Sequence, residues 1–338
     1  MTDGREFRVG LLGVGAIAQV VHLPILHHMA GVRVAALCDV DQPKAKAIAT
    51  RFGVERVARN DDEVFQAPDL DAVVIATPSH LHESQAIAAM QGGKHVLVEK
   101  PLAIQPEAAQ RVIRVAEETN LTLMVAMNNR YRPDTMALRP FATNGELGNV
   151  FLARGAWLNR KMRVVRPTWR HKLATAGGGA LIDLGVQTLD LAMWFLDWPK
   201  VKSLMCYTHP GEGMEVEDSA AIILRLQNGS AISLSLSWSL VAEKDRHYMR
   251  LLGTRGSGSI QPLQVYKEVD HQGILDVTPP LPANNENIYT VSYRAELEDF
   301  VSTARGDKPP QLPREQAELM RLVHLAYQSA REGREIEA

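Results

Sequence analysis

Hydrophobic positions in the first third of the chain form short apolar runs separated by longer amphipathic stretches. The short runs predict buried strands, and the amphipathic stretches predict helices. The predicted strands are Phe7–Leu12, Val32–Leu37, Asp71–Ala76, His95–Val98 and Leu121–Val125, and the predicted helices are Ile17–Met29 (locally distorted by Pro24), Gln42–Phe52, Leu81–Met90 and Gln105–Thr119. Strands that alternate with helices indicate a parallel, doubly wound sheet, whose ligands bind beyond the carboxyl ends of the strands.

From about Asn149 the pattern changes to longer strand-like runs that follow one another without intervening helices, which is typical of a mostly antiparallel sheet. These runs are Val150–Leu158, Lys202–Thr208, Ala220–Leu226, Ala231–Trp238, Tyr248–Gly253 and Leu263–Val269. A strongly apolar helix is predicted over Leu181–Leu196, and two terminal helices over Tyr289–Gly306 and Arg314–Gly333. The sequence therefore predicts two regions of different architecture.

The turn after the first strand has the composition of a dinucleotide-binding turn. Gly13 allows a tight turn, Gly15 lets the backbone approach a pyrophosphate, and Ala18 permits close helix–strand packing. Asp39 ends the second strand, where an acid accepts hydrogen bonds from a ribose diol, and the adjacent Asp41 could share this role. Because a carboxylate repels the extra phosphate of NADP, we expect NAD rather than NADP.

Composition and charge exclude several other functions. The 338 residues carry 37 basic and 39 acidic side chains, so the net charge of −2 favours neither nucleic acid nor a membrane surface as a partner. No apolar run approaches the roughly 20 residues that span a bilayer, and the charged start does not resemble a secretory peptide, so we expect a cytoplasmic protein. Cys38 and Cys206 are far apart and are predicted to be buried thiols in a reducing compartment.

Three loops at the predicted carboxyl edge of the sheet carry polar motifs: TPSHLH (77–82), EKP (99–101) and NNRY (128–131). A lysine directly after a buried strand is unusual. Lys100 is interpreted as an ammonium beside a reacting hydroxyl or carbonyl, and the alternative is a surface ion pair between Glu99 and a neighbour. His80 and His82 are expected to pack against a cofactor or to hold the loop. Without a third ligand in pattern, no metal site is predicted.

GVGAIA (13–18), EKP (99–101) and GGGALIDLGVQTLD (177–190), in this order and at these distances, resemble the Gfo/Idh/MocA oxidoreductase family over essentially the whole chain. The resemblance implies an α/β fold: an N-terminal NAD(P)-binding Rossmann domain at residues 1–126, and a C-terminal α+β domain at 127–338 with an open-faced, mostly antiparallel sheet. The second domain would bind substrate and form a homodimer or homotetramer, and its terminal helices would pack back towards the Rossmann domain. Members are typically NAD(P)-dependent dehydrogenases or reductases of sugars, inositols and related polyols.

The same resemblance assigns roles to individual residues. Lys100 matches the residue at the reacting centre, and Asp183 matches the aspartate of the third motif, with Gln187 four residues later. The residues expected to bind the cofactor are Gly13, Gly15, Ala16, Ile17, Asp39, Thr77, Pro78, His80, His82, Glu99, Lys100, Asn128, Trp169 and Arg170.

Gln187 departs from the family pattern, which usually has a histidine at this position. On an α-helix, residues i and i+4 share a face, so Asp183 and Gln187 are expected to point into one site. An amide has no pKa in the working range and cannot accept the substrate proton as an imidazole does, although it can still position a substrate. Lys100 is the preferred proton acceptor; Asp183 acting through water, or another side chain such as Tyr131 or His171, remain alternatives.

The segment from Leu147 to Ile182 contains no acidic residue. Its basic residues are Arg154, Arg160, Lys161, Arg163, Arg166, Arg170 and Lys172. The segment is either a solvated basic loop or a site for an anionic substrate such as a sugar acid or phosphate, because guanidinium groups bind such anions bidentately.

Three functions are compatible with these features. The leading hypothesis is a dehydrogenase or reductase that transfers hydride between NAD(P) and a CH–OH group of a sugar, polyol or sugar acid. The second is a catalytically silent NAD-binding regulatory protein, which Gln187 favours and the intact EKP loop and Asp183 disfavour. The third is an NAD-assisted, redox-neutral lyase or glycosidase.

Overall fold

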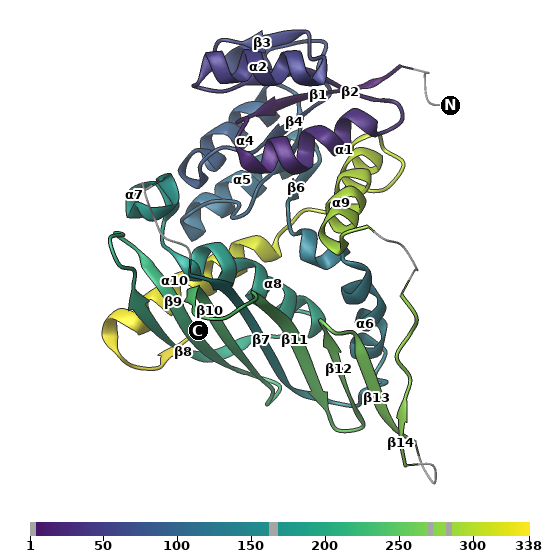
Figure 1. Ribbon diagram of the computed structural model, residues 1–338, viewed down its shortest axis with the longest axis vertical. Coiled ribbons are helices and arrows are strands. Elements are labelled where there is room, and N and C mark those ends of the chain that lie inside the picture. The colour runs from purple at the N-terminus through teal and green to yellow at the C-terminus, as the bar shows by residue number, and fades with distance from the viewer. Residues whose placement is uncertain (1–4, 162–167, 270–272, 282–285) are drawn as a thin grey trace. The chain divides into compact units, whose positions relative to one another are not determined.

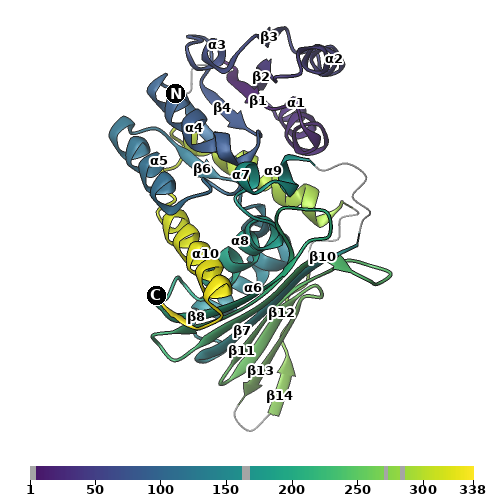
Figure 2. The same cartoon turned by 90° about the vertical axis from the view of Figure 1, so that its left-hand side faces the viewer.

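The computed structural model describes residues 5–161, 168–269, 273–281 and 286–338 (Figures 1 and 2). The chain forms two compact units. The first unit comprises Met1–Asn128 and Tyr289–Ala317, and the second comprises Asn129–Ile288 and Glu318–Ala338. The predicted boundary at residue 126 and the predicted role of each domain stay predictions.

A six-stranded parallel sheet forms the centre of the first unit, as the alternating pattern predicts. In spatial order its strands are β3 (Arg56–Ala58), β2 (Val32–Cys38), β1 (Phe7–Leu12), β4 (Ala72–Ile75), β5 (His95–Val98) and β6 (Leu123–Val125). The strand order reverses between β1 and β4, and the carboxyl ends of the strands on both sides of such a switch point are where doubly wound sheets bind ligands. The Rossmann-like fold class is confirmed.

The helices of this unit are α1 (Leu23–His28), α2 (Gln42–Phe52), α3 (Asp61–Phe65), α4 (His82–Gln91), α5 (Pro106–Thr119) and α9 (Ile288–Ala304). The predicted helix Ile17–Met29 is in fact a π-helix, η1 (Ala18–His22), followed by α1. The distortion therefore precedes Pro24, which occupies the first turn of α1, where a missing N–H costs nothing. The strand β3 and the helix α3 were not predicted, because they are too short to show a period.

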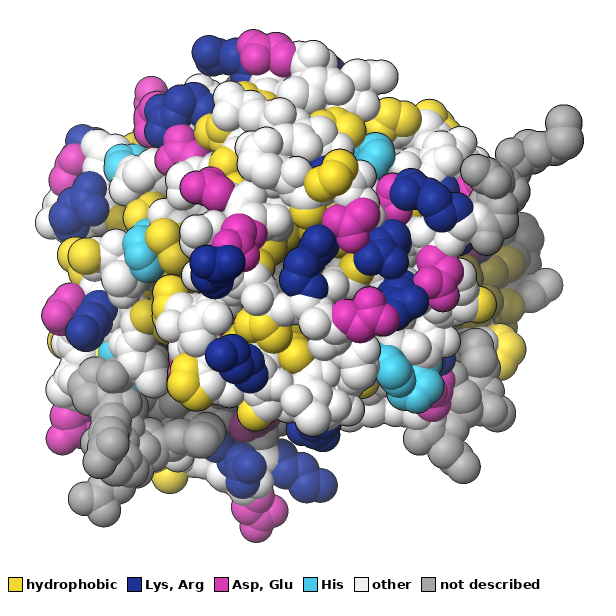
Figure 3. Space-filling model, turned by 90° about the horizontal axis from the view of Figure 1, so that it is seen from above, with side chains coloured by type: hydrophobic (Ala, Val, Ile, Leu, Met, Phe, Trp, Pro, Cys, Tyr) yellow, Lys and Arg dark blue, Asp and Glu magenta, His cyan; other side chains and the backbone are white. Residues whose placement is uncertain are grey.

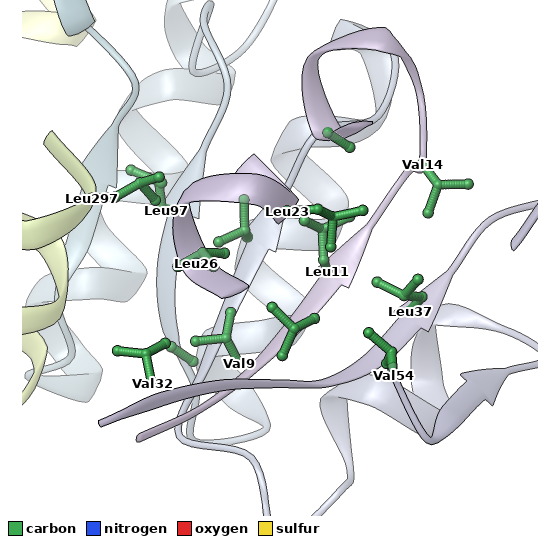
Figure 4. Close-up of a cluster of buried hydrophobic side chains, with 14 of the residues drawn as sticks. Val9, Leu11, Val14, Leu23, Leu26, Val32, Leu37, Val54, Leu97 and Leu297 are labelled. Carbon is green, nitrogen blue, oxygen red and sulfur yellow. The ribbon is translucent and has the colours of Figure 1, made fainter. Parts of the chain in front are cut away.

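Helix α9 packs into the core of the first unit although it lies far away in the sequence. Leu297 of α9 is fully buried in one cluster with Val9, Leu11 and Leu97 of the sheet (Figure 4). Phe300 of α9 is fully buried in the same cluster. The cluster also includes Leu23 and Leu26 of α1. Burial of each such side chain contributes about 1.5–3 kcal/mol, which explains why α9 belongs to this unit.

A nine-stranded sheet forms the second unit. In spatial order its strands are β14 (Gly273–Asp276), β13 (Gln264–Val269), β12 (Gly256–Ile260), β11 (Arg246–Gly253), β7 (Val150–Arg160), β10 (Ala231–Leu240), β9 (Glu217–Leu226), β8 (Val201–Pro210) and β15 (Ile336–Glu337). Among the strands that the structure describes here, only β7 and β10 pair in parallel, so the prediction of a mostly antiparallel sheet is confirmed. The strand β12 was missed because its sequence, GSGSI, lacks an apolar alternation.

Helices cover one face of this sheet. Figures 1 and 2 show α6 (Pro133–Thr143), α8 (Val186–Phe195) and α10 (Glu315–Glu332) along the same face. Side chains alternate across β9 accordingly: Ile222 and Leu224 are buried under the helices, whereas Ile223 between them is 55% exposed. In the described part of the chain no helix covers the opposite face, so the sheet is open-faced.

The surface shows no preference for one charge on the face drawn in Figure 3, where basic and acidic side chains are interspersed. None of the helices in the described ranges is both long and apolar enough to cross a membrane.

Candidate active site

The glycine turn after β1 leaves room for a bound dinucleotide. Gly13 has φ +83°, and a Cβ there would lie 2.6 Å from the carbonyl oxygen of Ala76, so no other residue fits. A Cβ at Gly15 would meet no atom within 4 Å, so open space lies where the backbone must approach a pyrophosphate. This space, the glycines and the acid at the end of β2 together fit a nicotinamide dinucleotide.

Asp39 supports the turn as well as marking the end of β2. Its carboxylate accepts hydrogen bonds from the backbone N–H groups of Val14 (2.7 Å) and Asp41 (2.9 Å). The Lys44 ammonium lies 3.6 Å from the same carboxylate. Asp41 has a separate function, because its side chain accepts from the Lys44 N–H and caps α2.

Replacing Asp39 with serine is expected to lower the preference for NAD over NADP. Hydrogen bonds to a charged acceptor contribute about 1.5–3 kcal/mol, and the carboxylate also repels a 2′-phosphate. The ratio of kcat/KM with NAD to kcat/KM with NADP should therefore fall at least about tenfold, since 1.4 kcal/mol corresponds to a factor of ten. Asp41→Ser is the matched control, because serine also caps a helix; a larger fall in the control would transfer the role to Asp41.

Glu99 of the EKP loop is bound inside the first unit. Its Oε1 lies 2.9 Å from Nε2 of His22, which is fully buried on η1. Burial by itself would raise the pKa of Glu99, but the hydrogen bond and charge of His22, with the charge of Lys100, hold it below its ordinary value. Glu99 is therefore a carboxylate that connects the EKP loop to η1, and Lys100 follows it at the carboxyl end of β5.

His82 holds two loops together. Its Nδ1 lies 2.7 Å from the carbonyl oxygen of Pro101, its Nε2 lies 2.9 Å from that of Thr77, and its side chain is buried. Burial lowers the pKa of His82 although both carbonyl groups favour the protonated ring. Of the two predicted roles, this geometry matches the structural one.

The other predicted cofactor residues of the first unit occupy the same edge of the sheet. Thr77 donates to Gln85, and Pro78 is half-buried beside it. His80 is exposed, as is Ala16 in the glycine turn, and Ile17 is half-buried. Asn128 is buried, and its amide nitrogen donates to the Ser292 hydroxyl (3.0 Å) on α9. The structure thus gathers these residues at the loops that follow β1, β4, β5 and β6.

In the second unit, the GGG turn is shaped by two residues that sequence analysis did not identify. The Glu217 carboxylate accepts from the N–H groups of Gly179 (3.0 Å) and Leu181 (2.9 Å) and from the Tyr327 hydroxyl (2.8 Å). A Cβ at Gly178 would lie 1.8 Å from the Tyr327 oxygen, and one at Gly179 would lie 1.8 Å from the Glu217 carbonyl oxygen. Burial raises the pKa of Glu217, and it also raises that of Tyr327.

Gly179→Ala is expected to destabilise the protein, whereas Gly15→Ala is not. The new methyl group at 179 would overlap a backbone carbonyl, and overpacking of this kind costs about 1–3 kcal/mol. The methyl group at 15 enters open space, so it should leave the unfolding free energy unchanged while weakening NAD binding. Urea denaturation and titration with NAD measure the two effects, and a Gly179→Ala variant as stable as wild type would contradict the packing argument.

Asp183 and Gln187 lie where a π-helix, η5 (Leu181–Gly185), joins α8. Asp183 is inside the π-helical segment, so the i, i+4 relation of a regular α-helix does not describe its position relative to Gln187. The Asp183 carboxylate accepts from the indole N–H of Trp238 (3.2 Å), and the Gln187 carbonyl oxygen accepts from the Asn129 amide (3.1 Å). Neither Trp238 nor Asn129 was singled out from the sequence, although Asn129 lies within the NNRY motif.

Asp190, the second aspartate of the third motif, has a structural partner. Arg130 of NNRY donates to both of its oxygens, at 2.7 and 2.6 Å, and Asp190 is buried. The motif's two aspartates therefore have separate functions: Asp190 anchors α8 to the segment that follows β6, and Asp183 remains the candidate for chemistry.

The sequence matches known proteins along most of its length. Residues 7–127 match the Gfo/Idh/MocA N-terminal domain, described as an oxidoreductase family with an NAD-binding Rossmann fold, and residues 142–338 match its C-terminal alpha/beta domain. The chain belongs to the Gfo/Idh/MocA family. This confirms the resemblance inferred from the three motifs.

Individual members of the family are moderately similar to this chain. It is 27% identical to D-glucoside 3-dehydrogenase of Escherichia coli (strain K12), over 98% of this chain and 97% of that protein. It is 32% identical to an uncharacterized oxidoreductase, ORF334, of Rhizobium meliloti, over 89% of this chain and 90% of that protein. The crystal structure of GenD2 from gentamicin A biosynthesis in complex with NAD matches with a TM-score of 0.86 at 26% identity, covering 99% of this chain and 97% of GenD2.

This Gfo/Idh/MocA chain buries an arginine under its second sheet. Arg132 is fully buried and donates to both oxygens of Asp134, at 3.0 and 2.6 Å, and to Nδ1 of His247 at 3.0 Å. Burial and the charge of Arg132 lower the pKa of His247 to about 3, so this imidazole stays neutral and accepts. The His247 ring stacks on Trp157, with 4.3 Å between ring centroids. None of these residues was predicted from the sequence.

The basic segment of this family member is partly neutralised. Arg160 pairs with Asp245 (3.4 Å) and Lys161 with Glu212 (3.5 Å). The Arg170 guanidinium lies 4.4 Å from the Trp169 ring. Arg154 and Lys172 are exposed, and Arg163 and Arg166 fall outside the described residues. These pairs favour the solvated-loop interpretation for Arg160 and Lys161, and recognition of an anionic substrate stays a prediction.

Cys38 and Cys206 are free and buried, as predicted, and burial raises the pKa of each thiol to about 12. Such thiols are not nucleophiles. Within the described ranges of this family member, no group of three histidine, cysteine or acidic side chains could hold a metal ion.

Proposed function

We propose that the chain is an NAD-dependent oxidoreductase that interconverts a CH–OH group and a carbonyl group on a sugar, an inositol or other polyol, or a sugar acid. The observation that carries this proposal is the EKP loop. The Glu99 carboxylate is bound by His22, and Lys100 lies beside it at the carboxyl end of β5, on the edge of the sheet that fits a dinucleotide. The activity named for the Escherichia coli relative and the NAD bound by GenD2 support the same reaction.

The proposed chemistry assigns each residue a limited role. When bound, the nicotinamide supplies the hydride donor and acceptor. We assign Lys100 to the substrate oxygen, where its amine form takes the O–H proton and the ammonium that results stabilises the negative charge on that oxygen. Asp183, oriented by Trp238, is assigned to a second polar contact with the substrate. Gln187 transfers no proton, because an amide does not titrate in the working range.

The test is the absorbance of the reduced nicotinamide with NAD or NADP and a panel of aldoses, polyols, inositols and uronic acids. Reduced cofactor that appears with at least one substrate supports the proposal. Tight NAD binding without turnover on any member of the panel would contradict it. Mass analysis of the products would then distinguish a redox-neutral lyase or glycosidase, which changes the substrate, from a silent NAD-binding regulator, which does not.

We further propose a cytoplasmic homodimer or homotetramer that associates through the open face of the second sheet. That face presents the exposed side chains of Ile223 and Tyr207 beside the small, uncharged Ser233 and Ser235 of β10. The exposed Arg154, Arg225 and Arg250 lie on the same face, so the proposed contact is a mixed one, in which apolar and small side chains pack between charged groups. A monomeric mass by light scattering at micromolar concentration would contradict the assembly.

A further inference from the structure

Two buried histidines bind the residues on either side of Lys100. Nε2 of His22 lies 2.9 Å from Oε1 of Glu99, and Nδ1 of His82 lies 2.7 Å from the carbonyl oxygen of Pro101. The two histidines are 0% and 1% exposed, so both contacts are shielded from water. Lys100 itself is half-buried. The residues before and after the candidate proton acceptor are therefore both held from the interior of the first unit.

The His22 ring has a fixed position in this interior. His22 is the last residue of η1, and its neighbours along the chain, Leu23 and Leu26, are fully buried in the apolar core. The Tyr293 ring of α9 lies edge-on to the His22 ring, with 6.4 Å between the ring centroids. A side chain in a close-packed core does not change its rotamer without disturbing its neighbours. His22 is therefore a rigid partner for Glu99.

The hydrogen bond to Glu99 is what a histidine adds at this position. Although burial raises the pKa of Glu99, His22 and the charge of Lys100 hold it below its ordinary value, so Glu99 is a carboxylate that only accepts. Nε2 of His22 must therefore carry the hydrogen between them. Nδ1 of His22 is buried, and within the described ranges no hydrogen bond to it is found. An apolar side chain would avoid the cost of this buried nitrogen, but it could not bind Glu99.

We propose that His22 is a positioning residue for Lys100 and that it acts through Glu99. His22 is fully buried, so its effect on the substrate is indirect. The Glu99 carboxylate interacts with the Lys100 charge as well as with His22. Without the His22 N–H, a carboxylate in this buried place would turn to the Lys100 ammonium for compensation and draw it away from the substrate oxygen. This inference rests on the proposed function, which assigns Lys100 to that oxygen.

The first test measures the EKP loop without substrate, cofactor or turnover. Hydrogen exchange of the backbone amides in residues 98–103 is followed by mass spectrometry; they include the Glu99 N–H, which donates to the Ile75 carbonyl oxygen (2.9 Å). His22→Met has no N–H, so exchange in this segment should become at least about tenfold faster, the factor expected for loss of a hydrogen bond to a charged group. Unchanged exchange would overturn the proposal, whatever the protein catalyses.

Two amide variants separate the hydrogen bond from the shape of the ring. His22→Gln keeps an N–H at a reach similar to that of Nε2 and should restore most of the protection, whereas His22→Asn has the same amide on a shorter side chain and should not. This comparison also decides the question if His22→Met does not fold. Exposed His27→Met, on α1, is the matched control and should leave the loop unchanged. Equal exchange in the glutamine and asparagine variants would overturn the role of the N–H.

The second test is a double-mutant cycle with Lys100→Met, using the best substrate of the panel and enzyme concentrations determined by NAD titration. His22→Met alone should lower kcat at least about tenfold, because misplacing a reacting group by about 1 Å can cost about a hundredfold, while KM changes much less. In the Lys100→Met background the same substitution should lower kcat less than about twofold, since no lysine is left to position. The same factor in both backgrounds would show a merely structural role and overturn the proposal.

The outcomes separate this inference from the proposed function. If wild type oxidises a polyol and His22→Met does so equally fast, the positioning role fails and the dehydrogenase stands. If wild type turns over no member of the panel, the proposed function fails and the effect of His22 on catalysis fails with it. The exchange measurement then still decides whether His22 holds the EKP loop.

Discussion

Replacing Lys100 with methionine is expected to lower kcat by about 10²–10⁴, the contribution usual for a residue that transfers a proton in the transition state. Lys100 follows β5 directly, next to a carboxylate that is already bound to His22. Methionine keeps the length and apolar part of the side chain but removes the ammonium. Because Gln187 cannot accept a proton, no titrating side chain is left at the usual position to compensate.

Two further variants test whether the loss of kcat arises from proton transfer by Lys100. Lys100→Arg keeps the positive charge, but a guanidinium does not lose its proton at working pH, so it separates charge stabilisation from proton transfer. If Lys100 transfers the proton, arginine should be nearly as inactive as methionine. Lys46→Met, on the exposed surface of α2, is the matched control and should leave kcat unchanged. A Lys100→Met enzyme that keeps more than about a tenth of kcat would move the proton transfer to another group.

The first sheet could be predicted from the sequence because its strands are buried on both faces. The apolar runs at Phe7–Leu12 and His95–Val98 coincide with β1 and β5, since parallel strands that are buried on both faces are apolar over most of their length. The strand β12 carries no such signal: it contains small residues, and a Cβ at Gly258 would lie 2.3 Å from the Leu138 side chain. Its pairing depends on neighbours that are distant in sequence.

The candidate site could be located from the sequence but not explained by it. The three glycines and Asp183 form a visible motif, yet two of the glycines, Gly178 and Gly179, are required by Tyr327 and Glu217, which lie far along the chain. The partners of Asp183 and Gln187, Trp238 and Asn129, are 55 and 58 residues away. Hydrogen bonds over such separations leave no periodic pattern, so only the three-dimensional structure shows them.

The two glycine-rich motifs that were identified from the sequence are followed by π-helices. The glycine turn leads into η1 (Ala18–His22), and the GGG turn leads into η5 (Leu181–Gly185). Reading side-chain directions from an α-helical period fails at such segments, which are frequent at functional sites. His22, the last residue of η1, binds Glu99, and Asp183, in the middle of η5, contacts Trp238. The departure from regular helix therefore occurs where the candidate site is built.

Asp134→Ala is expected to give the largest loss of stability among single substitutions in the second unit. Arg132 is fully buried, and Asp134 is its bidentate partner, at 3.0 and 2.6 Å. Removal of one partner of a buried pair leaves an uncompensated charge and costs about 3–5 kcal/mol. His247 cannot replace the carboxylate, because its pKa of about 3 keeps it a neutral acceptor. Urea denaturation should show the loss as a lower midpoint.

Two comparison variants decide whether the loss of unfolding free energy in Asp134→Ala comes from the unneutralised charge of Arg132 or from the missing side chain of Asp134. Arg132→Met combined with Asp134→Leu removes both charges and should recover much of the stability, because apolar replacements of a buried ion pair are often tolerated. Glu117→Ala breaks a surface pair with Arg314, whose side chain is 72% exposed, and should change the unfolding free energy by about 1 kcal/mol or less. If Asp134→Ala costs no more than Glu117→Ala, the Arg132 guanidinium reaches water and the buried pair does not stabilise this unit. If the double variant is as unstable as Asp134→Ala, the loss reflects packing around α6 rather than electrostatics.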